Sequence, residues 1–78
     1  MHAREQGQVE LPALEVFELE PDELSHDAAF DAELDVDSLQ KLEFIAALEQ
    51  RFGIRYSARE GSRMNSLDDA VAITRGHM

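Results

Sequence analysis

The sequence predicts an all-α fold, a small helical bundle in which residues 1–78 form a single domain. The length of 78 residues is that of one small domain. Hydrophobic residues make up 44% of the chain, aromatic residues only 6%, and there are two prolines and four glycines. This composition favours packed helices over a disordered tail or a sheet-rich fold. Apolar residues also recur at helical spacing in several segments.

The charge of the chain narrows the classes of partner. Its 17 acidic residues outnumber 7 lysines and arginines, which gives a formal net charge of -10. A negative surface repels phosphate backbones and anionic lipid headgroups, so we expect neither nucleic acid nor a membrane as a partner. The sequence has no cysteine, which excludes disulfides and thiolate metal sites. Any thiol chemistry therefore needs a thiol from outside the chain.

Targeting and membrane segments are not evident in the sequence. No apolar run reaches the length of a signal-peptide core or a membrane span. We therefore expect a soluble, cytoplasmic protein, and we expect it to be a monomer.

Residues 5–17 are expected to supply the first helix. Apolar residues that one helix face can hold are Val9, Leu11, Ala13, Leu14, Val16 and Phe17. Gly7 and Pro12 argue against an unbroken helix, since a proline inside a helix costs about 3 kcal/mol or more. We expect a kink at Pro12 or a helix that starts there.

Residues 18–37 are expected to form a long acidic loop between the first two helices. The segment holds nine acidic residues and Pro21. A few apolar residues are expected to anchor it in the core: Leu19, Leu24, Phe30, Leu34 and Val36. A loop of this length is unusual in so small a domain and suggests a function.

Residues 38–52 are the clearest helix. They contain strong helix formers without glycine or proline. Asp37 and Ser38 are the capping residues at the start, and Gly53 follows the end.

Two further helical segments are expected after this helix. Residues 57–63 form a short helix or a turn, anchored by Met64.

The last helix is expected to run to about Arg75. Asn65 and Asp68 have the spacing of a capping box at its start. The residues that recur at helical spacing behind them are Leu67, Ala70, Val71 and Thr74.

The helix of residues 38–52 has two apolar faces. At about 100 degrees per residue, the arc that faces the core contains Phe44, Ile45, Leu48 and Phe52. A second strip lies outside this arc and consists of Leu39, Leu42 and Ala46, bordered by Glu43, Glu49 and Gln50. The strip either packs on another helix of the bundle or forms an exposed surface for a partner with a basic, apolar groove.

Ser38 has several possible roles. A serine after an aspartate at a helix start is often a cap. A catalytic nucleophile fits worse, because V-D-S-L-Q differs from the G-x-S-x-G elbow and no strand precedes it. The candidate bases His2, His26 and His77 lie near the termini or in the acidic loop. No catalytic residue is therefore predicted.

The acidic segment before Ser38 raises two further questions, whether it binds calcium and whether Ser38 can carry a phosphate group. Asp31, Glu33, Asp35 and Asp37 alternate as in a calcium loop, but the positions that require glycine and a bidentate glutamate hold Val36 and Leu42. No metal site is predicted. A phosphodiester on the Ser38 hydroxyl is physically permitted, because a helix N-terminus favours an anion by about 0.3 to 1 kcal/mol, although adjacent Asp37 opposes it.

The run L-D-V-D-S-L at residues 34–39, followed by L-E-F-I-A-A-L-E-Q-R-F-G-I at residues 42–54, resembles the acyl carrier proteins of fatty-acid and polyketide synthesis. The likeness extends from about Val16 to Thr74. It includes the L-E-P-D-E-L loop at residues 19–24, Phe30, and N-S-L-D-D-A at residues 65–70.

The resemblance implies a four-helix bundle, with three main helices and a short third helix, that is not an enzyme. Ser38 would carry 4'-phosphopantetheine, whose thiol would hold acyl intermediates as thioesters. The partners implied are a phosphopantetheinyl transferase, a ketosynthase, and an acyltransferase or acyl-activating enzyme, all with basic docking patches. The matching contact residues would be Asp37, Glu43 and Glu49, with Leu39, Leu42 and Ala46 as the apolar ones.

Some residues depart from the pattern of the family. Asp35 stands where a glycine is usual, so the loop must turn without the freedom of glycine. Gln40, Lys41 and Gln50 stand where many members have an acid or a neutral residue, which thins the acidic rim. Two alternatives stay open: a peptidyl or aminoacyl carrier, although the glycine pair usual before its serine is missing, and an unmodified carrier-like interaction module in which Ser38 only caps.

Overall fold

The computed structural model describes residues 2–77, with side chains from residue 7 onward. Within residues 2–77 the chain forms helices and no strands. The elements are α1 (His2–Phe17), a 3-10 turn η1 (Pro21–Glu23), α2 (Ser38–Phe52), α3 (Ala58–Arg63) and α4 (Leu67–Gly76). The predicted all-α class is confirmed, with three longer helices and a short third one.

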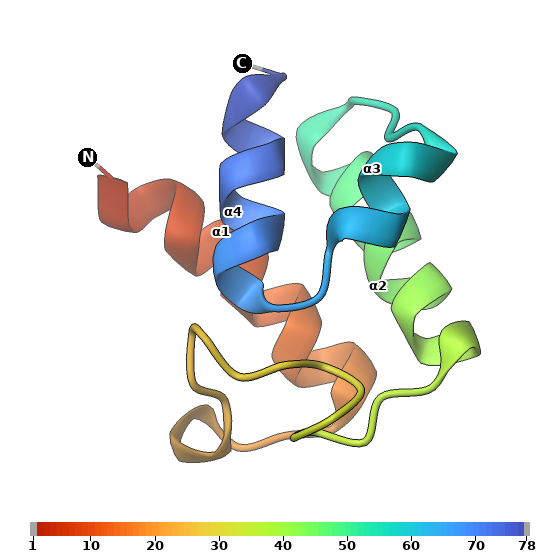
Figure 1. Ribbon diagram of the computed structural model, residues 1–78. Helices are drawn as coiled ribbons and strands as arrows, with labels where there is room; N and C mark the ends of the chain where they lie inside the picture. Colours follow the sequence, from red (N-terminus) through yellow and green to blue (C-terminus); the bar gives the residue numbers. More distant parts are fainter. Residues whose placement is uncertain (1, 78) are drawn as a thin grey trace.

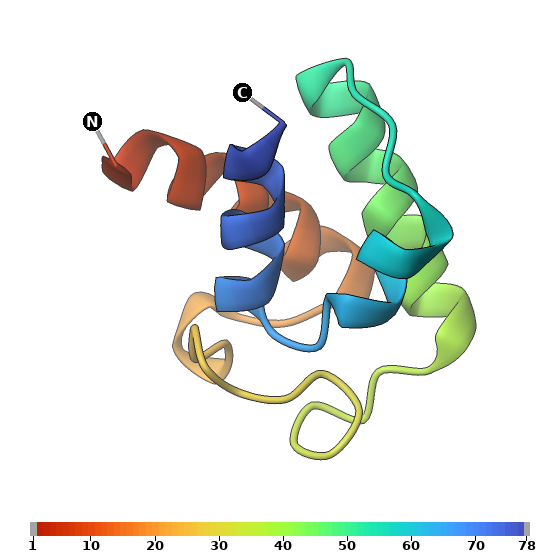
Figure 2. The same cartoon turned by 45° about the horizontal axis from the view of Figure 1, so that its top comes forward.

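The helices pack around α1. This helix contacts both α2 and α4, and the short α3 lies between α2 and α4 (Figure 1). The loop of residues 18–37 passes below the helices and returns to the start of α2, as Figure 2 also shows. The beginning of α2 therefore lies where the acidic loop ends.

Pro12 lies inside α1, which runs unbroken from His2 to Phe17. Of the two alternatives expected at Pro12, a kink or a helix start, the helix start is therefore wrong. Burial explains the tolerance, since Pro12 and the neighbouring Val9 and Ala13 are all buried and tertiary packing outweighs intrinsic helix propensity. The helix is visibly curved in Figures 1 and 2, as a proline inside a helix commonly causes.

Glu18 ends α1 in a left-handed conformation, with a φ of 56°. The backbone N–H of Leu19 donates to the carbonyl of Leu14 over 3.0 Å, which is the closing hydrogen bond of a Schellman motif. Glycine is the usual residue at this position. Here a charged residue takes it and turns the chain into the acidic loop.

Three phenylalanines from three segments form the centre of the core. The ring centroids of Phe17 on α1, Phe30 in the loop and Phe44 on α2 are 5.1 to 5.7 Å apart in edge-to-face and tilted contacts. Other buried apolar residues surround them: Val9, Ala13, Leu24, Val36, Leu48, Met64, Leu67, Ala70 and Val71. Such aromatic pairs add about 0.5 to 1.5 kcal/mol beyond their burial.

The predicted anchors of the acidic loop are confirmed. Leu24, Phe30 and Val36 are buried in the core, and Leu19 and Leu34 pack against it. Backbone hydrogen bonds add to this, from the Phe30 N–H to the Asn65 carbonyl over 2.8 Å and from the Asp68 N–H to the His26 carbonyl over 2.9 Å. The loop is thus fixed to the start of α4.

The two short connections near α3 and α4 have their own caps. Ser57 and Glu60 form a capping box at the start of α3, and Met64 behind it is buried as predicted. At α4 the capping residue is Ser66, whose hydroxyl accepts from the N–H of Asp69 over 3.2 Å. The prediction of an Asn65 and Asp68 capping box is therefore wrong by one residue.

Candidate functional site

Ser38 is the first residue of α2, and its side chain is exposed. The capping residue is Asp37. Its Oδ1 accepts from the Gln40 N–H over 2.8 Å, and Gln40 Oε1 accepts from the Asp37 N–H over 3.1 Å. Ser38 is therefore not the cap, contrary to one of the interpretations of the sequence. Because Asp37 caps the helix, the hydroxyl of Ser38 is available for chemistry.

The turn before Ser38 is made by Asp35, which has a φ of 58°. This is the left-handed region, which a glycine adopts without strain and which aspartate tolerates better than most residues. Val36 follows it, buried, and its N–H donates to the Phe30 carbonyl over 2.8 Å. A strained turn, a core anchor and a cap thus set the position of Ser38.

The apolar strip of Leu39, Leu42 and Ala46 is exposed. Leu39 and Leu42 are 65% and 63% exposed, whereas Phe44 and Leu48 on the opposite face of α2 are fully buried. The strip does not pack on another helix, which removes one of the two interpretations of the sequence. Glu43 beside it is exposed as well.

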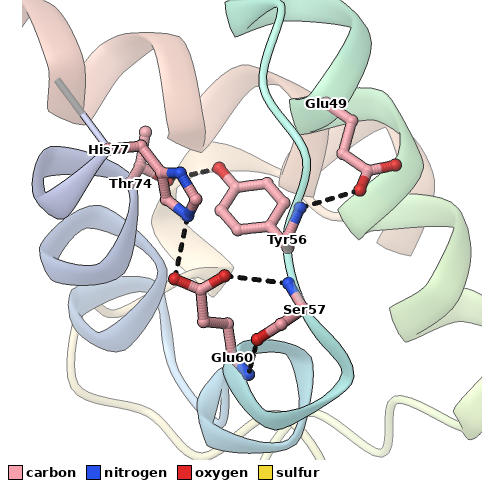
Figure 3. A network of polar contacts seen from close by, with 6 residues as sticks. All are labelled: Glu49, Tyr56, Ser57, Glu60, Thr74 and His77. Carbon is pink, nitrogen blue, oxygen red and sulfur yellow. Dashed lines mark hydrogen bonds and ion pairs between the residues drawn. The ribbon is translucent and has the colours of Figure 1, made fainter.

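Glu49 differs from Glu43, because it is half-buried and engaged inside the molecule. Its Oε2 accepts a hydrogen bond from the backbone N–H of Tyr56 over 2.9 Å (Figure 3). Sequence reasoning missed this contact, since Tyr56 follows α2 only after the turn at Gly53.

Tyr56 is the centre of a polar network that links the segment before α3 to α4 (Figure 3). Its hydroxyl is 2.6 Å from Thr74 Oγ1, and its ring packs edge-on against His77. Burial raises the pKa of the Tyr56 hydroxyl, the hydrogen bond to Thr74 opposes the rise, and the carboxylates of Glu49 and Glu60 add to it. The hydroxyl therefore stays neutral and holds α4.

Glu60 completes the network. Its Oε1 accepts from the Ser57 N–H over 2.8 Å, and its Oε2 lies 2.8 Å from His77 Nε2. The hydrogen bond from Ser57 is the main cause that lowers the pKa of Glu60, and His77 lowers it further. The short helix α3 is thus held at both its start and its contact with α4.

A groove of about 520 Å³ lies between α2 and α3. Its lining is Ser38, Lys41, Leu42, Ile45, Ala46, Glu49, Tyr56, Ser57, Ala58, Gly61 and Ser62. Gly61 allows the two helices to lie close, because a Cβ there would be 3.3 Å from Ile45 Cδ1. Four of the seven predicted site residues border this groove: Ser38, Leu42, Ala46 and Glu49.

A smaller hollow of about 160 Å³ lies on the other side of Ser38. It is lined by Phe30, Asp31, Val36, Asp37, Ser38, Lys41 and Asn65. Asp37 belongs to this hollow, while Leu39 and Glu43 border neither space. The predicted residues therefore fall into a groove, a hollow and an exposed strip that meet at Ser38.

The described histidine side chains are engaged away from Ser38. His26 Nε2 lies 4.0 Å from Glu10 Oε1, and His77 contacts Glu60. The side chain of His2 lies outside the described residues. Neither His26 nor His77 lines the groove or the hollow at Ser38.

Among the side chains described for residues 7–77, no group of three or more histidine, aspartate or glutamate residues is placed to hold a metal ion. Every helix within residues 2–77 is too short or too polar to cross a membrane.

Comparisons with known proteins agree on the family. Residues 7–72 match the family described as "Phosphopantetheine attachment site". The chain is 33% identical over 61 residues to an acyl carrier protein of Lactobacillus acidophilus, covering 78% of this chain and 76% of that protein.

Two other relatives come from different bacteria. Over 59 residues the chain is 36% identical to polyketide-8 synthase acyl carrier protein 2 of Streptomyces avermitilis, covering 76% of this chain and 68% of that protein. Over 53 residues it is 30% identical to an acyl carrier protein of Thermosynechococcus vestitus, covering 68% and 65%. The chain therefore belongs to the acyl carrier protein family, whose members bear a phosphopantetheine attachment site.

Proposed function

We propose that this protein carries acyl intermediates as thioesters on a 4'-phosphopantetheine arm attached to Ser38, and that it has no catalytic activity of its own. The cofactor supplies the thiol that the sequence lacks. The chain supplies the attachment point and the surface that partner enzymes bind.

The observation that carries the proposal is the state of the Ser38 hydroxyl. It is exposed at the start of α2, and Asp37 performs the capping that would otherwise engage it. A hydroxyl that is exposed at the end of the turn at Asp35 and not used for capping is accessible to a loading enzyme. The groove of about 520 Å³ beside it falls within the range of about 300 to 1,000 Å³ usual for small-molecule sites. These residues therefore fit a phosphopantetheine group.

The exposed strip on α2 supports the proposed docking of partners. Leu39 and Leu42 offer apolar contact area next to the attachment point, and Glu43 offers a negative charge for a basic patch. Opposite charges steer the encounter, and apolar contacts slow dissociation. We infer that a phosphopantetheinyl transferase, a ketosynthase, and an acyltransferase or acyl-activating enzyme bind here, with Asp37, Ala46 and Glu49 at the edges of the contact.

The relatives favour acyl cargo of fatty-acid or polyketide biosynthesis. Two are acyl carrier proteins and one is a polyketide synthase acyl carrier protein. We place the protein in one of these two pathways rather than among peptidyl carriers.

Intact mass spectrometry tests the attachment. The protein is incubated with coenzyme A and a broad-specificity phosphopantetheinyl transferase, and the parent is expected to gain the mass of one phosphopantetheine. Ser38→Ala is expected to gain none. Ser62→Ala is the matched control, because Ser62 is also exposed and borders the same groove, and it is expected to be loaded like the parent.

Two outcomes would contradict the proposal. Loading of Ser38→Ala would move the attachment to another residue. Failure of the parent to load, under conditions that load a known carrier, would favour an unmodified interaction module. Far-UV circular dichroism of each variant checks that the helices are retained.

A further inference from the structure

Lys41 is the only lysine in the sequence, and it lies three residues after Ser38 on α2. Residues three apart on a helix are neighbours on its surface. Lys41 is half-buried, and its Nζ donates to Asn65 Oδ1 over 3.4 Å. The ammonium is thus turned from α2 towards the segment before α4.

Lys41 and Ser38 together border both the groove and the hollow. Among the residues that line these two spaces, Lys41 is the only cation. Asp31 and Asp37 line the hollow with carboxylates, and Glu49 lines the groove. Among the charged side chains that line the two spaces, the carboxylates would therefore repel an anion attached to Ser38, and only Lys41 would attract it.

The contact that holds Lys41 at present is weak. The distance of 3.4 Å between Lys41 Nζ and Asn65 Oδ1 is longer than the roughly 2.7 to 3.2 Å of an ordinary N–H···O hydrogen bond. A hydrogen bond between an ammonium and a phosphate is charge-assisted and stronger than one to a neutral amide. The ammonium would therefore gain free energy if it exchanged the amide oxygen of Asn65 for a phosphate oxygen.

We propose that Lys41 is the positioning residue for the phosphodiester at Ser38: its ammonium binds the phosphate and holds the first part of the arm at the mouth of the groove between α2 and α3. The inference rests on the attachment proposed above.

Phosphorus NMR of the fully loaded protein is the first test. Loading of each variant is completed and checked by intact mass before the spectrum is recorded, so that a slower transferase reaction does not affect the result. In the parent and in Lys41→Arg, added salt is expected to shift the phosphorus resonance, because salt screens the contact between charges. In Lys41→Gln the resonance is expected to start near the high-salt position of the parent and to move little.

Arg59→Gln is the matched control. Arg59 is exposed on α3 and lines neither the groove nor the hollow. Arg59→Gln therefore removes one positive charge, as Lys41→Gln does, but outside both spaces. Its phosphorus resonance is expected to follow that of the parent. A resonance that is the same in the parent, Lys41→Gln and Arg59→Gln would overturn the proposal.

The reactivity of the Lys41 amine is the second test. Because the sequence has one lysine, peptide mass mapping after treatment with an amine-acylating reagent reports on Lys41 alone. A phosphate in an ion pair with the ammonium shields it from the reagent, so loading is expected to slow acylation about three- to tenfold in the parent. Ser38→Ala, treated with the same loading mixture, is expected to show no change.

The outcomes separate this inference from the proposed function. A parent that does not load overturns both. The role of Lys41 is overturned, and the carrier function is not, if the parent loads at Ser38 but shows neither effect. In that case its Lys41 amine reacts equally fast before and after loading, and the phosphorus resonance is the same with and without Lys41.

Discussion

The carboxylate of Glu49 accepts a hydrogen bond from the backbone N–H of Tyr56 over 2.9 Å, which joins α2 to the segment that leads into α3. Glu43, about one and two-thirds turns earlier on the same helix, is exposed. Two acids that the resemblance assigns to the same docking role therefore have different structural surroundings.

The first prediction concerns stability at these two positions. Glu49→Ala is expected to lower the free energy of unfolding by about 1 kcal/mol, because the half-buried N–H of Tyr56 loses its acceptor. Glu49→Gln keeps an acceptor oxygen and is expected to lose less. Glu43→Ala is the control and is expected to stay within about 0.5 kcal/mol of the parent. Urea unfolding followed by circular dichroism measures the difference, and equal midpoints for the two alanine variants would contradict it.

Partner binding gives a second prediction. Glu43→Lys is expected to slow loading by the transferase and to weaken the salt dependence of its rate, because an exposed acid beside the attachment point is replaced by a cation. The fold should not change. Loading rates across a series of salt concentrations are the measurement. A rate and a salt slope equal to those of the parent would count against the docking surface.

The third prediction separates the cap from the attachment point. Asp37→Ala is expected to cost about 0.5 to 2 kcal/mol of stability, because Asp37 accepts from the Gln40 N–H. Ser38→Ala is expected to change stability little, since Ser38 does not cap α2. Asp37→Asn keeps an acceptor and serves as the control. A larger loss in Ser38→Ala than in Asp37→Ala would contradict the assignment of the cap.

The fourth prediction concerns the turn at Asp35. A φ of 58° is strained for a β-branched residue, so Asp35→Val is expected to destabilise the fold by about 1 to 2 kcal/mol. Asp35→Asn keeps the tolerance for this conformation while removing the charge, and it is the control for electrostatic effects. Thermal and urea unfolding compare the three proteins. If the valine and asparagine variants are equally stable, strain at Asp35 is negligible.

Acid sensitivity at Glu60 is the fifth prediction. The pKa of Glu60 is lower in the folded protein than its ordinary value of 4.5, so the folded state favours the charged form. Its contribution to stability is present above the unfolded-state value and is lost as the pH falls through the folded-state value. The stability gap between the parent and Glu60→Gln is therefore expected to be widest above about pH 4.5 and to close in acid. Urea unfolding at several pH values measures it, and a gap independent of pH would show that Glu60 acts through neutral contacts.

Much of the fold was predictable from local patterns. The bounds of α2 follow from strong helix formers between Asp37 and Gly53, and the anchors of the loop follow from isolated apolar residues in an acidic segment. For the candidate site, one local motif locates Ser38 and the apolar strip on α2, but it does not reveal the hydrogen bond between Glu49 and Tyr56. The two errors, a helix start at Pro12 and a cap at Asn65, have different causes: packing outweighed the first local preference, and the neighbouring cap at Ser66 replaced the second.

Composition, periodicity and capping act within a few residues, so the helical class, the negative surface and the motif around Ser38 could be read from the chain without its packing. Three other features depend on the tertiary structure. It exposes the strip on α2, turns Glu49 inward to Tyr56, and brings Lys41 to Asn65 across 24 residues of sequence. Such contacts depend on how helices pack, and packing joins residues whose spacing in the chain carries no periodic signal.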